Sequence, residues 1–343
     1  MHPTSTAQLN PGEEGINTRY LAPRASEVIH FYLFYTGNLE HFRSYLTMGA
    51  KSESYPKQQR ESLAGSIKYH AYTIWLFSRS DLKTILIPAT IFGVANALSG
   101  PLLTTNASPD PYKILARVPL VMFSTWLNLL VTDIANQRHP EAIIEDSINK
   151  KWRPLPSGRL SPANARRLLL ASIPVAVMKS VFLGDTLETL FLIPLIWMYS
   201  DLGGADTESH KVRDTLNGLG VTAFNASAAT IAFAPRAPSS PASSSFLQPS
   251  VLYSNPTYPL WHAVVLLLLC TTISTQDLPD LPGDIARNRR TLPIAHGEPA
   301  ARRWLAVLIA FWSVECGGGC EDVEDVVRVG GVRLSAAGGG VVD

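Results

Sequence analysis

The chain has 343 residues, of which 46% are hydrophobic and only 17% are charged, and its mean hydropathy of +0.10 leans away from a soluble domain. The net charge of +1 provides no polycationic field, so no nucleic-acid partner is expected. Three cysteines, two of them in the C-terminal tail, do not make a disulfide framework.

The first 70 residues are polar, so we expect them to form a partly disordered N-terminal segment. They lack the basic region and the apolar region of a signal peptide, so we expect no cleavable signal peptide. A span needs about 20 mostly apolar residues, because the hydrocarbon layer is about 30 Å thick. The sequence predicts an all-α transmembrane bundle over residues 71–314, interrupted by a Ser/Pro-rich loop at 235–257. Its six spans are expected near 83–104, 114–136, 165–183, 186–202, 215–234 and 258–276.

A seventh apolar segment begins at Trp304 and then stops. Residues 315–343 are rich in Gly and Val and lack helical periodicity, so we interpret them as an aberrant low-complexity tail. The bundle is therefore predicted to be truncated after the sixth or seventh span.

Basic residues are concentrated in two connections, which follow the second and sixth predicted spans. Because cytoplasmic loops are enriched in Lys and Arg, both connections are predicted to face the cytosol. The compartment is expected to be the endoplasmic reticulum or another intracellular membrane. The lipid bilayer is thus a predicted partner, and no obligate protein partner is evident.

An acidic cluster follows the second predicted span. Glu141, Glu145 and Asn149 recur every four residues and would share one face of a helix, beside Asp146 and after Asn136. Like charges at this spacing repel, and carboxylates at a membrane edge are costly to desolvate. A cation is therefore expected there.

A second acidic cluster ends the sixth predicted span. If helical, Asp277, Asp280 and Asp284 form a stripe about 10 Å long, although Pro279 and Pro282 favour a broken helix end. Hard oxygen ligands at an incomplete protein site suit Mg²⁺, which often shares its coordination shell with substrate phosphates. The alternative is that both clusters are solvated rims of membrane helices. For Asp133, one turn deeper, helix packing and ligand roles remain equally open.

At these residues the chain resembles the UbiA superfamily of membrane prenyltransferases, especially its fungal members. The resemblance covers about Trp75 to Trp312. Its most specific part is the continuous run Asn149-Lys150-Lys151-Trp152-Arg153-Pro154-Leu155-Pro156-Ser157-Gly158-Arg159. The second part is the run Gln276-Asp277-Leu278-Pro279-Asp280-Leu281-Pro282-Gly283-Asp284, which leads to Arg290-Thr291-Leu292-Pro293.

The resemblance implies nine helices around a lipid-facing cavity, with Mg²⁺ and a prenyl diphosphate held by the two acidic motifs. It implies a first metal cluster of Asn136, Glu141 and Glu145, with Asp146 beside it, and a second of Asp277, Asp280 and Asp284. Lys150, Arg153 and Arg290 would contact phosphate oxygens. The chain departs from the family in three ways. Gln137 stands where Asp is usual, and Glu141 lies five residues after Asn136, outside the usual spacing. Only about six of the nine expected helices are complete.

Three functions follow as hypotheses. The first is Mg²⁺-dependent transfer of a prenyl group to a small, aromatic acceptor, as in secondary metabolism. The second is terpene cyclisation, in which the same site ionises the diphosphate and the cation reacts with its own double bonds. The third is a truncated, inactive membrane relative. Phe123, Trp126, Trp197 and Tyr199 are candidates for stabilising a carbocation, or are packing residues.

Overall fold

The computed structural model describes residues 63–233 and 251–317, which form helices and contain no strand. Its first half holds α3 (Leu63–Ser78), the π-helix η2 (Leu82–Leu86), α4 (Ile87–Leu98), η3 (Gly100–Leu102), α5 (Pro111–Ala116), α6 (Val118–Gln137), α7 (Pro140–Asn149) and α8 (Pro162–Leu183). It continues with α9 (Thr186–Ser200), η4 (Gly204–Asp206), α10 (His210–Phe233), η5 (Val251–Ser254), α11 (Thr257–Thr272), η6 (Ile273–Gln276), α12 (Asp277–Ala286), α13 (Leu292–His296) and α14 (Glu298–Gly317).

Local sequence signals explain several helix boundaries. The Asp110 carboxylate accepts hydrogen bonds from the backbone N–H groups of Tyr112 and Lys113 at the start of α5, and the Ser161 hydroxyl caps α8 in the same way. Gly184 ends α8 with a φ of +93°, a left-handed conformation that glycine adopts without strain. This turn lets α9 begin two residues later and pack back against α8.

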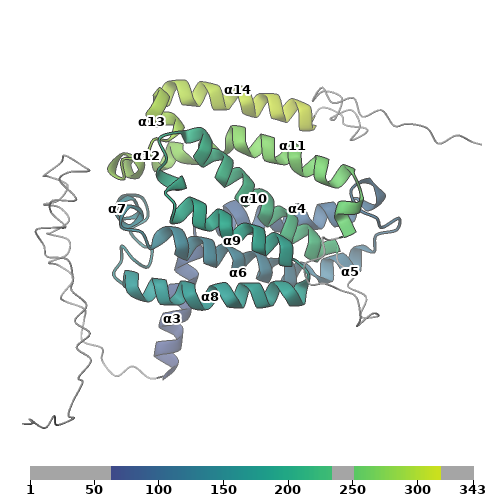
Figure 1. Cartoon of the computed structure of the whole chain (residues 1–343), viewed down its shortest axis with the longest axis horizontal. Coiled ribbons are helices and arrows are strands. Elements are labelled where there is room, and N and C mark those ends of the chain that lie inside the picture. Colours follow the sequence, from purple (N-terminus) through teal and green to yellow (C-terminus); the bar gives the residue numbers. More distant parts are fainter. Residues whose placement is uncertain (1–62, 234–250, 318–343) are drawn as a thin grey trace, which may run out of the picture. The chain divides into compact units, whose positions relative to one another are not determined.

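The long helices pack side by side as a bundle, and α7 and α12 lie next to each other at one of its ends (Figure 1). Helices α4 and α10 approach each other closely, because a Cβ atom on Gly93 would lie 2.6 Å from the backbone carbonyl carbon of Ala228. Val121 and Ile134 on α6 and Ala228 on α10 are almost fully buried in the apolar core. Packing in this core therefore fixes α6 and α10, the helices that lead to the α7–α12 end of the bundle.

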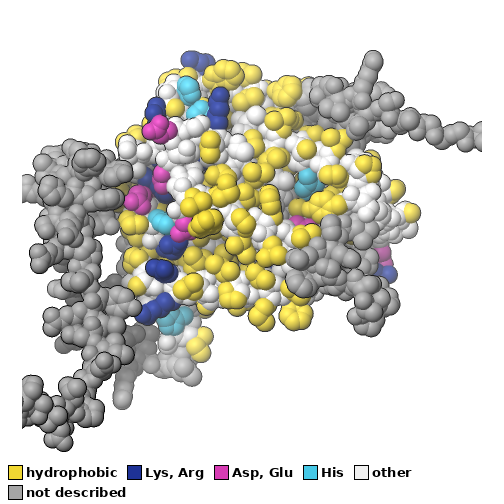
Figure 2. All heavy atoms as spheres, in the orientation of Figure 1, with side chains coloured by type: hydrophobic (Ala, Val, Ile, Leu, Met, Phe, Trp, Pro, Cys, Tyr) yellow, Lys and Arg dark blue, Asp and Glu magenta, His cyan; other side chains and the backbone are white. Residues whose placement is uncertain are grey.

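Large apolar side chains also cover the outside of the bundle. On α8, Leu170, Val175, Met178 and Phe182 are all more than half exposed. Figure 2 shows hydrophobic side chains over the middle of the molecule, whereas most charged side chains in this view gather towards the end that carries α7 and α12. Exposed apolar surface on this scale marks contact with a membrane. The fold is a helical membrane bundle, as predicted.

Helices form at each of the six predicted spans, but fewer of them meet the criteria for a membrane span than the sequence suggested. By length and apolar composition, two helices among the described residues are long enough to cross a membrane, Val118–Gln137 and Thr257–Arg287. A pair bent by 57°, Gly65–Ser78 with Leu82–Leu98, makes a third if it counts as one span. Among the other predicted spans, α9 has only 15 residues, and α8 carries Arg166, Arg167 and Lys179.

Two predicted irregular regions differ from expectation in detail. The chain before Asp277 is broken by the 3₁₀ segment η6, yet the three aspartates that follow do lie on a helix, α12, despite Pro282 within it. The apolar segment expected from Trp304 is part of a longer helix, α14. Residues 1–62, 234–250 and 318–343, which hold most of the N-terminal segment, the Ser/Pro-rich loop and the tail, lie outside the described residues.

Candidate active site

A cavity opens at the α7–α12 end of the bundle, lined by charged side chains near its mouth and by apolar ones further in. Its charged residues are Asp81, Asp133, Glu145, Lys150, Arg153, Arg213, Asp277, Asp280, Asp284 and Arg289. Its apolar lining includes Leu129 on α6, Leu192 on α9 and Phe224 on α10. A charged mouth above an apolar pocket suits a substrate with an ionic head and a hydrocarbon tail.

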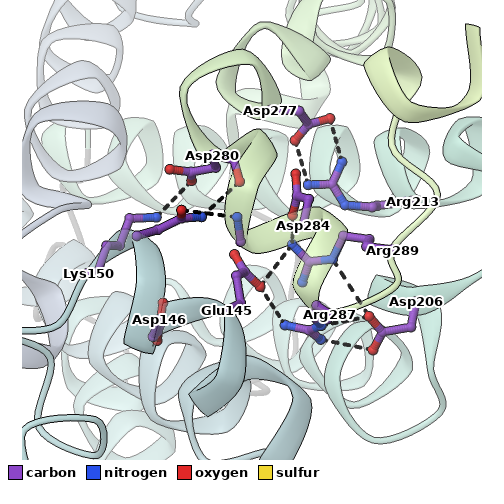
Figure 3. A network of polar contacts seen from close by, with 12 residues as sticks. Glu145, Asp146, Lys150, Asp206, Arg213, Asp277, Asp280, Asp284, Arg287 and Arg289 are labelled. Carbon is purple, nitrogen blue, oxygen red and sulfur yellow. Dashed lines mark hydrogen bonds and ion pairs between the residues drawn. The ribbon is translucent and has the colours of Figure 1, made fainter. Parts of the chain in front are cut away.

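The two acidic clusters are joined by hydrogen bonds between α7 and α12. The Asn149 side chain donates to the backbone carbonyl of Asp280 at 2.8 Å, and its Oδ1 accepts from the backbone N–H of Gly283 at 3.1 Å. The Lys150 ammonium group donates to Asp280 Oδ2 at 2.8 Å. Clusters that are 130 residues apart in the sequence therefore form one site (Figure 3).

Each aspartate of the second cluster has a cationic partner. Arg213 on α10 donates two hydrogen bonds to the Asp277 carboxylate, at 2.7 and 2.9 Å. Arg289 donates to Asp284 at 3.0 Å and lies 3.2 Å from a carboxylate oxygen of Glu145. Arg289 thus bridges the first and second clusters, as Figure 3 shows.

A second arginine ties the mouth to the connection between α9 and α10. Arg287 donates to Glu145 Oε2 at 2.9 Å and to both carboxylate oxygens of Asp206, in η4, at 2.7 and 2.8 Å. Burial raises the pKa of the Glu145 carboxyl, but Arg289 and Arg287 beside it outweigh this effect and hold the pKa below its ordinary value. Glu145 is therefore an anion although it is buried.

Arg153 is the centre of a third set of contacts. It is 6% exposed, donates to both oxygens of Asp146 at 2.9 and 3.1 Å, and also donates to Ser80 and Asp81. Asp81 lies at the bend between α3 and η2 and lines the cavity. This arginine connects the start of the bundle to the first acidic cluster.

The structure brings together most of the predicted site residues. Asn136, Glu145, Lys150, Arg153, Asp277, Asp280 and Asp284 line the cavity. Asp146 is buried beside Arg153 and is not part of the lining, whereas Glu141 and Arg290 are exposed and outside it. Arg289, not Arg290, is the guanidinium that faces the cavity.

Among the aromatic candidates, Tyr199 lines the cavity and the other three do not. Phe123 and Trp197 are about half exposed on the outside of the bundle, where packing against lipid is the simpler role. Phe224 on α10 is the aromatic residue of the lining that sequence reasoning missed.

Sequence reasoning also missed Asp81, Asp206, Arg213 and Arg289. No acidic pattern surrounds Asp81 in the sequence. Arg213 stands just before the span predicted at 215–234, where an arginine is itself a signal of a buried acidic partner.

The cavity lining fits a divalent cation in its charge and in its ligand atoms. Its described residues include six carboxylates and four cationic side chains, so the formal charge is −2 when all are ionised. Asn136 Oδ1, Asp133 Oδ2 and Asp284 Oδ2 are buried without a hydrogen-bond partner. In the described part of the chain, no three His, Cys, Asp or Glu side chains converge tightly enough to hold an ion alone. Mg²⁺ tolerates such an incomplete site, because it keeps waters and binds substrate phosphates.

The family model of the UbiA prenyltransferase family matches residues 94–320. The chain is 32% identical over 240 residues to the somaliensene A/B synthase of Streptomyces somaliensis, which covers 69% of each protein. It is 28% identical over 247 residues to the fumagillin beta-trans-bergamotene synthase of Aspergillus fumigatus, which covers 71% of this chain and 72% of the relative.

The fold also resembles a solved structure, that of a UbiA homolog from Archaeoglobus fulgidus bound to DMAPP and Mg²⁺. The TM-score is 0.51 at 14% sequence identity, and the alignment covers 75% of this chain and 82% of that one. This likeness concerns the arrangement of the helices.

Proposed function

This chain belongs to the UbiA prenyltransferase family, and from that premise we propose that it is a membrane enzyme that ionises a prenyl diphosphate with the help of Mg²⁺. The site is the α7–α12 cavity, with the diphosphate at its charged mouth and the prenyl chain in its apolar part. The UbiA homolog from Archaeoglobus fulgidus binds a ligand of this kind together with Mg²⁺.

One observation carries the proposal: buried donors and buried acceptors at the mouth both lack partners. The Nε–H groups of Arg153 and Arg213 have no hydrogen-bond acceptor among the described residues. Unpaired guanidinium donors suit phosphate oxygens, whereas the unpaired oxygens of Asn136 and Asp284 suit a cation. When all six carboxylates are ionised, the lining has a formal charge of −2 and would repel a bare diphosphate, so the metal and the substrate are expected to bind together.

In the proposed reaction, the bond between C1 of the prenyl group and the diphosphate oxygen breaks, and both electrons leave with the diphosphate. Asn136, Glu145, Asp277, Asp280 and Asp284 would hold Mg²⁺, which when bound neutralises charge on the leaving group. Lys150, Arg153, Arg213 and Arg289 would donate hydrogen bonds to the phosphate oxygens as negative charge develops there. The apolar lining would exclude water from the allylic cation.

Two fates for this cation are open to the same site. We put intramolecular cyclisation first, since the two relatives described above are named as synthases of somaliensene and of beta-trans-bergamotene and not as transferases. Transfer to a small aromatic acceptor is the second candidate, favoured by the family to which the chain belongs. For either fate, we propose that the cavity mouth faces the cytosol from an intracellular membrane, as the basic connections predict.

The test is diphosphate release by the purified full-length protein in lipid nanodiscs, with Mg²⁺ and farnesyl diphosphate. We expect release by the wild type and at least a hundredfold loss in Asp280→Asn, because one carboxylate of the site becomes neutral. The matched control is Glu208→Gln, which removes the same charge from an exposed position in the α9–α10 connection. Equal rates in the two variants would contradict the proposed site.

Product analysis then separates the fates. A cyclic hydrocarbon formed from the prenyl diphosphate alone supports cyclisation, whereas a product that requires an aromatic acceptor supports transfer. A wild-type protein that releases no diphosphate under any of these conditions would favour the inactive relative and overturn the proposed function.

A further inference from the structure

Three helices, α6, α9 and α10, line the apolar part of the cavity. Its deepest lining residues are Leu129 on α6, Leu192 on α9 and Phe224 on α10. Residues three or four positions apart share a helix face. One helical turn farther from the mouth than the lining residues Thr132, Leu192 and Phe224, the same faces carry Asn128, Thr189 and Ser227, respectively. The hydrocarbon lining therefore gives way to polar side chains on all three helices.

These residues belong to a buried hydrogen-bonded network that lies one helical turn beyond the cavity lining. Lys179 on α8 donates to Asp185 Oδ2 at 2.9 Å and to Ser124 Oγ at 2.6 Å. The Ser227 hydroxyl donates to Asp185 Oδ2 at 2.7 Å. Each member is at most 7% exposed. We call this network the polar layer, which consists of Ser124, Asn128, Lys179, Asp185, Thr189 and Ser227.

The polar layer also ties the helices of the cavity to one another. Asn128 Nδ2 donates to Thr189 Oγ1 at 3.2 Å, which links α6 to α9. The bond from Ser227 to Asp185 links α10 to the residue that precedes α9. A hydrocarbon chain that pushed between these helices would break such bonds and leave buried polar groups and a charged pair without partners, which is costly inside a membrane.

We propose that the polar layer is a fixed floor that limits the length of the prenyl chain this site accepts, an inference that rests on the proposed function. The available depth follows from the helix rise of 1.5 Å per residue. It is about 10 Å from Asn136 to Leu129 along α6 and about 16 Å from Arg213 to Phe224 along α10.

An extended residue has three chain bonds and spans about 3.4 Å, so an isoprene unit with four chain bonds spans about 4.5 Å and the depth holds roughly two or three units. The geometry thus favours geranyl and farnesyl chains. The longer geranylgeranyl chain does not fit above the polar layer. We expect the wild type to prefer farnesyl over geranylgeranyl diphosphate by about tenfold, which corresponds to about 1.4 kcal/mol.

The experiment measures kcat/KM for geranyl, farnesyl and geranylgeranyl diphosphates with the full-length protein and Mg²⁺. In parallel, thermal shifts report binding of the three corresponding thiolodiphosphates, which do not need to react. Leu192→Phe raises the floor and should lower the farnesyl-to-geranyl ratio about tenfold in both measurements. Phe191→Leu, on the exposed side of α9, is the matched control and should leave the ratio unchanged.

A second variant tests the polar layer itself. Thr189→Ala removes the α6–α9 bond and should raise the geranylgeranyl-to-farnesyl ratio about fivefold, because the floor opens. Equal binding of all three chain lengths by the wild type, or unchanged ratios in both Leu192→Phe and Thr189→Ala, would overturn the floor alone. Failure of every thiolodiphosphate to bind in the presence of Mg²⁺ would instead overturn the proposed function.

Discussion

Gly283 on α12 controls how closely the two acidic clusters approach, and the substitution Gly283→Ala tests this role. A Cβ atom at this position would lie 2.2 Å from Asn149 Nδ2 and 2.6 Å from its Cγ. The amide would have to move away. It would then lose its bond to the Asp280 carbonyl and its bond from the Gly283 N–H. Both bonds hold α7 against α12.

The expected cost to stability is small, and the expected cost to activity is large. Two hydrogen bonds contribute about 1–3 kcal/mol in total, and replacing a helical glycine by alanine returns about 0.5–1 kcal/mol. The variant should therefore fold. A displacement of about 1 Å between reacting groups lowers a rate about a hundredfold, so kcat/KM for diphosphate release should fall by that order.

A double-mutant cycle isolates the clash as the cause. Asn149→Ala removes the amide that the new methyl group meets, so adding Gly283→Ala to it should cost little more than Asn149→Ala alone. The measurements are kcat/KM for diphosphate release and the free energy of unfolding. If Gly283→Ala kept wild-type kcat/KM, or if the two substitutions were additive, the reasoning about close approach would be wrong.

Three more predictions follow from single contacts. Arg289→Lys should lower kcat/KM for diphosphate release at least tenfold, because lysine cannot reproduce the guanidinium bridge between Glu145 and Asp284, whereas Arg290→Lys at an exposed position should change it less than about twofold. Gly93→Ala should lower the free energy of unfolding by about 1–3 kcal/mol, since its methyl group meets the α10 backbone; thermal unfolding in nanodiscs measures this, and an unchanged Tm would contradict it. Chelation of Mg²⁺ with EDTA should abolish both diphosphate release and thiolodiphosphate binding, and added Mg²⁺ should restore both, because the lining carries excess negative charge; binding that persists in EDTA would count against the metal.

The sequence alone was sufficient to predict those site residues that are spaced regularly along a single helix. Glu145 and Asn149 lie one helical turn apart, and Asp277, Asp280 and Asp284 lie on one helix, so helical spacing predicts both clusters directly. Glu141 shares that periodicity, but the structure places it exposed at the start of α7 and outside the cavity lining. Periodicity defines a face of a helix and does not tell where along that face the partner helix ends.

The sequence was insufficient for residues whose role depends on a distant partner. Arg213 pairs with Asp277 across 64 positions, and Arg153 reaches Asp81 across 72 positions. Arg289 and Arg290 are neighbours in the sequence, and only the backbone at the end of α12 decides which one turns inwards. Asn288, one residue earlier, has a φ of +61°, a conformation that asparagine tolerates better than most residues and that helps to set this direction. Such choices require the tertiary structure.

The pairing of acids and bases at the mouth explains how the charged site is stable before it binds anything. Asp277, Asp280 and Asp284 are each held by a cation, and burial of an unpaired charge at the edge of a membrane would be strongly unfavourable. In the proposed complex with a diphosphate and Mg²⁺, the carboxylates would turn to the metal, and the released guanidinium and ammonium groups would turn to the phosphate oxygens. Opposite charges remain in contact in both states, so the protein needs to reorganise side chains and not helices. The fixed hydrogen bonds between Asn149 and α12 keep the backbone in place during that exchange.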